Sequence, residues 1–188
     1  MIALGRRPGA RGIIIAGARS ALSDRIEREI AGAGSPVLRV GRPGPASVAR
    51  SRQPPSRAVL HVEVPPSGGR ALREFRRDVA DQAFALSRMM GARASILVVA
   101  GHRGAEGAAG PYGFGGMLTR MRAAAQQELA LTVTLNALVL TGRVGEGTVS
   151  YRVREAMRGR SLPDSDFVIR DEDVRTMSIA EVITEERS

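Results

Sequence analysis

The chain has 188 residues, of which 43% are hydrophobic and 25% charged, and it contains no cysteine and no tryptophan. This length and composition predict one domain with an aliphatic core, and the lack of thiols excludes disulfides and thiolate chemistry. The net charge is +9, and all 28 basic residues are arginine. Only 3% of the residues are aromatic. Stacking platforms are therefore scarce, and the composition argues against nucleic-acid binding despite the charge.

Apolar runs and segments of helical periodicity alternate along the chain. Aliphatic and β-branched runs predict strands over 12–17, 37–42, 58–64, 94–101 and 131–140. Helical spacing predicts helices over 22–34, 70–90, 112–130, 153–159 and 171–186. Ser20 or Ser23 is expected to cap the first helix, and Asp171 the last. The alternation predicts an α/β, Rossmann-like fold, doubly wound around a mostly parallel sheet.

The remaining segments predict loops and no membrane segment. Residues 43–57 are rich in Pro, Ser and Arg without periodicity, which indicates a loop. No apolar run is long enough to span a bilayer, and the first residues lack the apolar stretch of a secretory signal, so we expect a cytoplasmic protein. His61, Glu63 and His102 are too few and too scattered to predict a metal site.

Six stretches, in this order, carry a family resemblance: IIIAGARSALSDRIEREIAGAG, AVLHVEV, FRRDVADQAFALSRMM, ASILVVAG, TVTLNALVLTG and RDEDVRTMSIAEVI. They resemble, in the same order, six features of the short-chain dehydrogenase/reductase family. The first three are the cofactor turn with its helix, the strand that ends in Asn-Ala-Gly, and the fourth helix. The last three are the strand that ends in the catalytic serine, the VN-x-x-x-PG strand, and the late helix. Asn136 and Gly142 match the ends of the fifth motif. The resemblance covers most of residues 1–188 and implies a single Rossmann-like domain.

The cofactor turn departs from the family's TGxxxGxG pattern. Gly17 keeps the first glycine, but Ala21 and Ser23 replace the other two, which adds bulk where the pyrophosphate would lie. The resemblance therefore implies that this chain binds no cofactor. Arg39 and Arg42 follow the position at which some relatives bind the phosphate of NADP, and we interpret them as surface charges.

The catalytic set is also degenerate. Tyr112 occupies the place of the family's catalytic tyrosine, but Gly116 replaces the lysine and Gly101 the serine. A phenol with a pKa near ~10 is a poor base at neutral pH without a nearby cation, and the chain has no lysine. These remnants predict a pseudoenzyme.

Two parts of the family's fold are expected to be missing. The loop 43–57 stands where the family has a helix, a strand and another helix, which cover one side of the adenosine site. The family also continues into a last strand after the stretch that resembles its late helix. The expected domain is thus a truncated one, with one wall of the cofactor site absent.

The hypothesis that follows is a non-catalytic subunit. Family members pair two long helices in a four-helix bundle, and the equivalents here are 70–90 and 112–130. The predicted partner interface comprises Phe84, Met89, Tyr112, Gly113, Gly116, Met117, Met121 and Ala124. The chain would form a heterodimer or heterotetramer with an active short-chain dehydrogenase that holds NAD(P). The non-catalytic subunit of hydroxybenzyl-succinyl-CoA dehydrogenase is similar in kind, which implies a hydroxyacyl-CoA thioester as substrate.

Two alternatives remain open. The first is a weakly active NAD(P)-dependent oxidoreductase that uses Tyr112, with Arg120 in place of the lysine. Because Arg120 lies two turns along the helix, we expect it to point away from the site. The second is a basic scaffold or nucleic-acid-binding protein.

Overall fold

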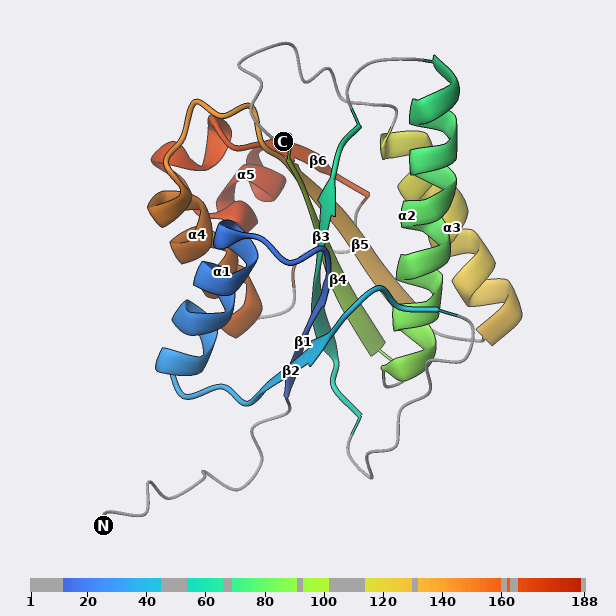
Figure 1. The fold of residues 1–188 in the computed structure, drawn as a ribbon, viewed down its shortest axis with the longest axis horizontal. Helices are drawn as coiled ribbons and strands as arrows, with labels where there is room; N and C mark the ends of the chain where they lie inside the picture. The colour runs from blue at the N-terminus through green and yellow to red at the C-terminus, as the bar shows by residue number, and fades with distance from the viewer. Residues whose placement is uncertain are drawn as a thin grey trace.

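The computed structural model describes residues 12–44, 54–65, 69–90, 93–101, 114–129, 132–159, 162 and 166–186. Its centre is a six-stranded sheet in which every strand pair is parallel, in the order β2-β1-β3-β4-β5-β6 (Figure 1). The strands are β1 (Ile13–Gly17), β2 (Val37–Val40), β3 (Arg57–Glu63), β4 (Arg93–Gly101), β5 (Thr132–Val139) and β6 (Val168–Arg170). The predicted α/β Rossmann-like fold is confirmed.

Helices cover both faces of the sheet. They are α1 (Ala21–Gly32), α2 (Gly69–Met89), α3 (Phe114–Leu129), α4 (Glu146–Arg158) and α5 (Ile179–Glu185). Helices α2 and α3 lie on one face, and α1, α4 and α5 lie on the other (Figure 1). Alternate strand residues enter the two layers, since Ile14 packs with α2 and α3 while Ile13 and Ile15 pack with α1 and α4. Burial on both faces explains why these strands are apolar throughout.

The connections reverse direction between β1 and β3. The chain moves one way from β1 through α1 to β2, and the other way from β3 through α2, α3 and α4 to β6. Helix α4 lies on the same face as α1, although it advances in the same direction as α2 and α3. The β5–α4–β6 crossover therefore has the opposite hand to the others, although about 98% of such crossovers share one hand. As a result, α4 packs beside α1.

The C-terminal region differs from its prediction. Residues 171–186 do not form one helix capped by Asp171: a 3₁₀ turn spans Asp173–Arg175, and α5 starts only after Ser178. The Asp171 side chain is buried and accepts hydrogen bonds from the backbone and side chain of Thr141, so it is not free to cap. Ser178 and Glu181 form the actual capping box.

Helix α4 also begins earlier than predicted, at Glu146 instead of at residue 153. The glycines at 145 and 147 give the segment the composition of a turn. However, Val149, Val153 and Met157 recur at helical spacing and are buried against the sheet. Burial of this stripe stabilises a helix that the local propensities disfavour.

Candidate functional site

The carboxyl ends of β1 and β3 form the natural binding edge of this sheet. In open α/β sheets, ligands bind beyond the carboxyl ends of the strands, at the point where the strand order reverses. A pocket of about 270 Å³ lies there, between the ends of β1 and β3 and helix α2. Its lining includes Gly17, His61, Arg42, Asp78 and Gln82. It is smaller than the roughly 300–1,000 Å³ of typical ligand sites.

Gly17 is required by the packing of β1 against β3. Its φ is +95°, in the region that favours glycine. A Cβ at this position would lie 2.0 Å from the carbonyl oxygen of His61, which pairs with Gly17 in the sheet. Internal packing therefore explains Gly17, the one glycine of this turn that matches the resembled motif, without a bound phosphate.

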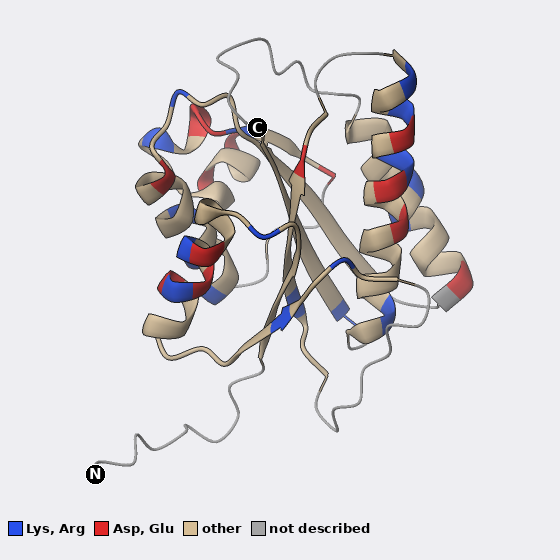
Figure 2. Cartoon of the chain, in the orientation of Figure 1, with Lys and Arg blue, Asp and Glu red and all other residues tan. Residues whose placement is uncertain are grey.

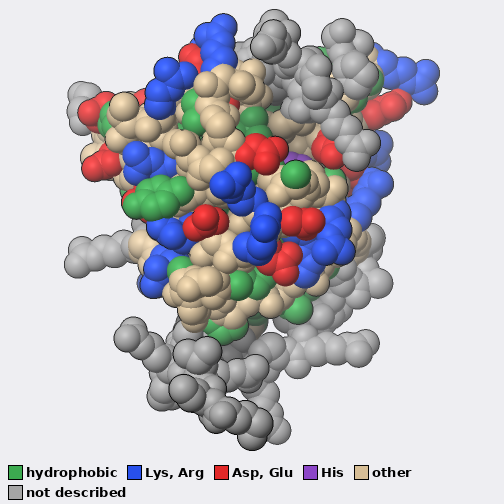
Figure 3. Space-filling view, turned by 60° about the vertical axis from the view of Figure 1, so that its left-hand side comes forward, with side chains coloured by type: hydrophobic (Ala, Val, Ile, Leu, Met, Phe, Trp, Pro, Cys, Tyr) green, Lys and Arg blue, Asp and Glu red, His purple; other side chains and the backbone are tan. Residues whose placement is uncertain are grey.

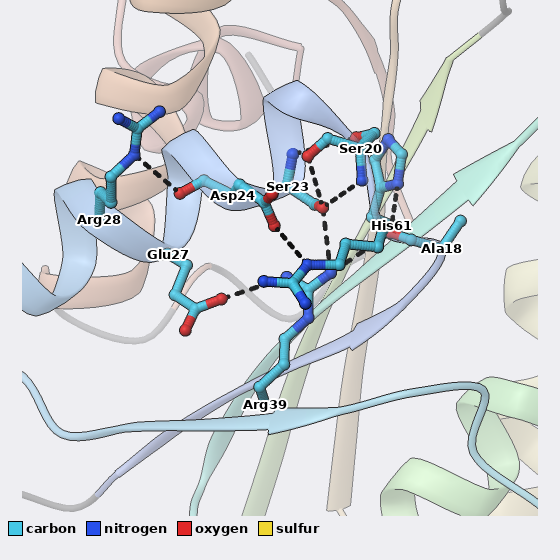
Figure 4. Close-up of polar contacts among 9 residues, drawn as sticks. Ala18, Ser20, Ser23, Asp24, Glu27, Arg28, Arg39 and His61 are labelled. Atoms are coloured by element: carbon cyan, nitrogen blue, oxygen red, sulfur yellow. Dashed lines mark hydrogen bonds and ion pairs between the residues drawn. The ribbon is translucent and has the colours of Figure 1, made fainter.

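The N-terminus of α1 is occupied by side chains of this chain (Figure 4). Ser20 is the N-cap and its hydroxyl accepts from the Ser23 amide, while the Ser23 hydroxyl accepts from the Ser20 amide. Ser23 is fully buried, and Arg39 donates to its hydroxyl at 3.0 Å. Ala21, the first residue of the helix, is exposed. An anion would have to compete with these contacts for the donors of the first turn.

Arg39 is an internal part of this site, so its interpretation as a surface charge was wrong. It crosses from β2 to the β1–α1 turn, where it also donates to the Ala18 carbonyl at 3.4 Å, and it lies 3.5 Å from the Glu27 carboxylate. Its side chain is 23% exposed. Arg42, in contrast, is largely exposed, as predicted, and pairs with Asp78 of α2, which in turn accepts from Gln82.

His61 joins the same turn to β3. Its Nδ1 lies 3.1 Å from the Ala18 carbonyl oxygen, which can only accept, so Nδ1 carries the proton. The side chain is buried, and only a small part of it is visible in Figure 3. Burial lowers the pKa of His61 from 6.5, although the hydrogen bond to Ala18 raises it. The imidazole is thus neutral at pH 7, and its hydrogen bond links β3 to the β1–α1 turn.

The predicted catalytic remnants are only partly described. Tyr112, Gly113 and His102 lie outside the described residues. Gly101 ends β4 and is buried, and a Cβ there would lie 3.1 Å from the side chain of Leu140. Gly116 is exposed in the first turn of α3.

Arg120 is exposed on α3, and its Nε donates to the Gly116 carbonyl at 3.0 Å. Its side chain therefore extends one turn back toward the N-terminus of α3. Because Tyr112 lies outside the described residues, the orientation of Arg120 relative to it stays a prediction.

The predicted interface residues separate into two groups. Met89, Met117 and Met121 are buried in the core between α2, α3 and the sheet, at 8%, 4% and 7% exposure. Phe84 and Ala124 are half-buried, and Phe84 also packs on this core. The outer surface of α3 is consequently formed by polar and small residues, while the methionines hold α3 on the sheet. The partner interface stays a prediction.

The described part of the chain has no group of three His, Cys, Asp or Glu residues placed to hold a metal ion. None of its helices is both long enough and apolar enough to cross a membrane.

Fold and site together define a Rossmann-like α/β domain whose β1–α1 turn is bonded to serine, arginine and histidine side chains of the same chain. No protein-family model matches the chain, and no curated protein matches it either. A functional assignment therefore depends on the site and on the resemblance of the sequence motifs.

Proposed function

We propose that this chain is a catalytically inactive subunit of the short-chain dehydrogenase type, which assembles with an active, full-length relative. The observation that carries the proposal is the β1–α1 turn. Ser23 stands where the family has a glycine and is buried, and the Arg39 guanidinium is bonded to it. A dinucleotide pyrophosphate needs open backbone amides at this helix N-terminus. Here the amide of the third helical residue is already bonded to Ser20.

The absence of lysine from the sequence supports the same proposal. A tyrosine acts as acid and base in this family because a lysine stabilises its phenolate and binds the cofactor ribose. No lysine exists in the chain, and Gly116 occupies the lysine position. The active partner would supply NAD(P) and the complete catalytic set, and the resemblance implies a hydroxyacyl-CoA thioester as its substrate.

Gly116 supports assembly through α2 and α3. Alanine forms helices better than glycine, and a Cβ at Gly116, in the first turn of α3, would contact no described atom within 4 Å. The same is true of Gly115 beside it. No contact within the described chain requires either glycine. Close approach by a helix of another subunit would require them, since glycine lets two backbones come together.

Co-expression with active short-chain dehydrogenases of the source organism tests the proposal. We expect a tagged chain to capture one of them, and that dehydrogenase to lose activity when expressed alone. Gly116→Leu should weaken capture by roughly tenfold or more, because the new side chain blocks the approach of the partner helix. Gly32→Leu is the matched control: its Cβ also faces open space, but Gly32 lies on α1, across the sheet.

Two results would contradict the proposal. One is a monomeric chain that leaves the activity of these dehydrogenases unchanged. The other is equal capture by the Gly116→Leu and Gly32→Leu variants, which would remove α3 from the interface.

One observation favours the weakly active oxidoreductase as a second candidate. The Arg120 side chain reaches back to Gly116, which brings a guanidinium toward the position of the missing lysine. Calorimetric titration with NAD(H) and NADP(H) separates the two functions. We expect no saturable binding by the isolated chain. Hydride transfer by the isolated chain, lost in Tyr112→Phe, would establish the second function instead.

A further inference from the structure

A basic groove runs between α1 and α4, on the face of the sheet opposite α2 and α3. The opposite hand of the β5–α4–β6 crossover places the two helices side by side, and both carry arginines interspersed with acidic residues (Figure 2). A pocket of about 730 Å³ opens between them, lined by Arg25, Arg28, Arg154, Arg158 and Glu29, together with the end of α1. Its volume lies within the range of ligand sites.

The charges in the groove are not balanced within the chain. Glu29 is the only acidic residue in the lining, and it pairs with Arg154 at 3.1 Å. Arg28 donates to the Asp24 carbonyl. Among the described residues, Arg25 and Arg158 have no ion-pair or hydrogen-bond partner, and both are exposed. Four arginines against one glutamate leave three positive charges around the pocket.

Helix capping does not explain these arginines. Cations at a helix C-terminus often offset its negative dipole end and bind its last carbonyls. At the end of α4, however, Arg57 of β3 already donates to the carbonyls of Met157 and Gly159. At the end of α1, the amides of residues 33–35 donate to the carbonyls of residues 29–31. Arg25 and Arg158 are left without an ion-pair or hydrogen-bond partner among the described residues.

We propose that this groove binds a phosphate group. Arginine forms bidentate, charge-assisted hydrogen bonds with phosphate, and the two guanidinium groups without a partner in the described chain, Arg25 beside Gly147 and Arg158 at the end of α4, can each donate to one. The groove lies across the sheet from α2 and α3, so a ligand there and a partner subunit on α3 can be bound at the same time. This proposal is independent of the proposed function.

Titration of the full chain with two probes tests the proposal. Inorganic pyrophosphate represents a small phosphate ligand, and a short fluorescent single-stranded oligonucleotide represents a phosphate polymer. The test variant is Arg25→Gln with Arg158→Gln. The control is Arg73→Gln with Arg77→Gln, which removes the same charge from exposed positions of α2 on the other face. Thermal melting checks that both variants remain folded.

We expect at least one probe to bind saturably, and the groove variant to bind it at least about tenfold more weakly while the control stays close to the wild type. Pyrophosphate binding would identify a small ligand, and binding of the oligonucleotide alone would identify a polymeric phosphate backbone. Equal weakening in both variants would show a general charge effect and overturn the proposal. Failure of both probes to bind would overturn it too.

Discussion

Replacing Gly17 by alanine tests whether this glycine is required by the fold. Two costs combine at this position. A non-glycine residue in the left-handed region costs roughly 1–2 kcal/mol, and φ here is +95°. The new Cβ would also lie 2.0 Å from the His61 carbonyl oxygen, which forces β1 and β3 apart. Overpacking of this kind costs roughly 1–3 kcal/mol. The free energy of unfolding should therefore fall by roughly 2–5 kcal/mol.

Gly34→Ala is the matched control. Gly34 has a similar φ of +83°, but its Cβ would contact nothing within 4 Å, so only the conformational cost of about 1–2 kcal/mol applies. Urea and thermal unfolding of the two variants measure the difference. For a domain of this size, 1 kcal/mol shifts the melting temperature by roughly 2–4 °C. Equal losses in the two variants would refute the packing argument and reopen a ligand-related role for Gly17.

Three further substitutions test the contacts of the β1–α1 turn and of the C-terminal end of α4. Because burial lowers the pKa of His61, the unfolded chain binds the proton more readily than the folded chain does. The free energy of unfolding should therefore fall as the pH drops below about 6.5. Urea midpoints measured against pH should fall less in the His61→Gln variant than in the wild type. Ser20→Ala breaks the capping box of α1 and should lower the free energy of unfolding by about 1 kcal/mol, with no loss predicted for the exposed Thr119→Ala. Arg57→Gln removes the donors at the end of α4 and should cost about 1–3 kcal/mol, which chemical denaturation would measure; an unchanged midpoint would contradict the role of Arg57 there.

The central strands could be predicted from the sequence because their composition is dictated by burial on both faces. Runs such as 94–101 contain no charged residue, and the structure buries that stretch throughout. Strand β6 could not be predicted in the same way. It has three residues, of which only Ile169 is buried, and it pairs only with β5. Its existence depends on a neighbouring strand, which no local pattern reveals.

The interior of the candidate site was also beyond sequence reasoning. Ser23 is bonded to Arg39, which is 16 residues away, and Ala18 is bonded to His61, which is 43 residues away. Neither pair follows from periodicity or spacing. The start of α5 was different, because Ser178 and Glu181 have the spacing of a capping box. That signal was present in the sequence and would have placed the helix correctly.

The two most informative glycines of the chain have opposite explanations. Gly17 resembles a remnant of a cofactor turn, yet the carbonyl of His61 leaves no room for any other residue. Its presence is therefore no argument for a dinucleotide. Gly116 stands where the short-chain dehydrogenase motif that the sequence resembles has a lysine, and no atom within the described chain restricts its Cβ. Alanine forms helices better than glycine, and no described contact would penalise a Cβ at this position. Under the proposed function, close approach by a helix of the partner subunit explains why the position is a glycine.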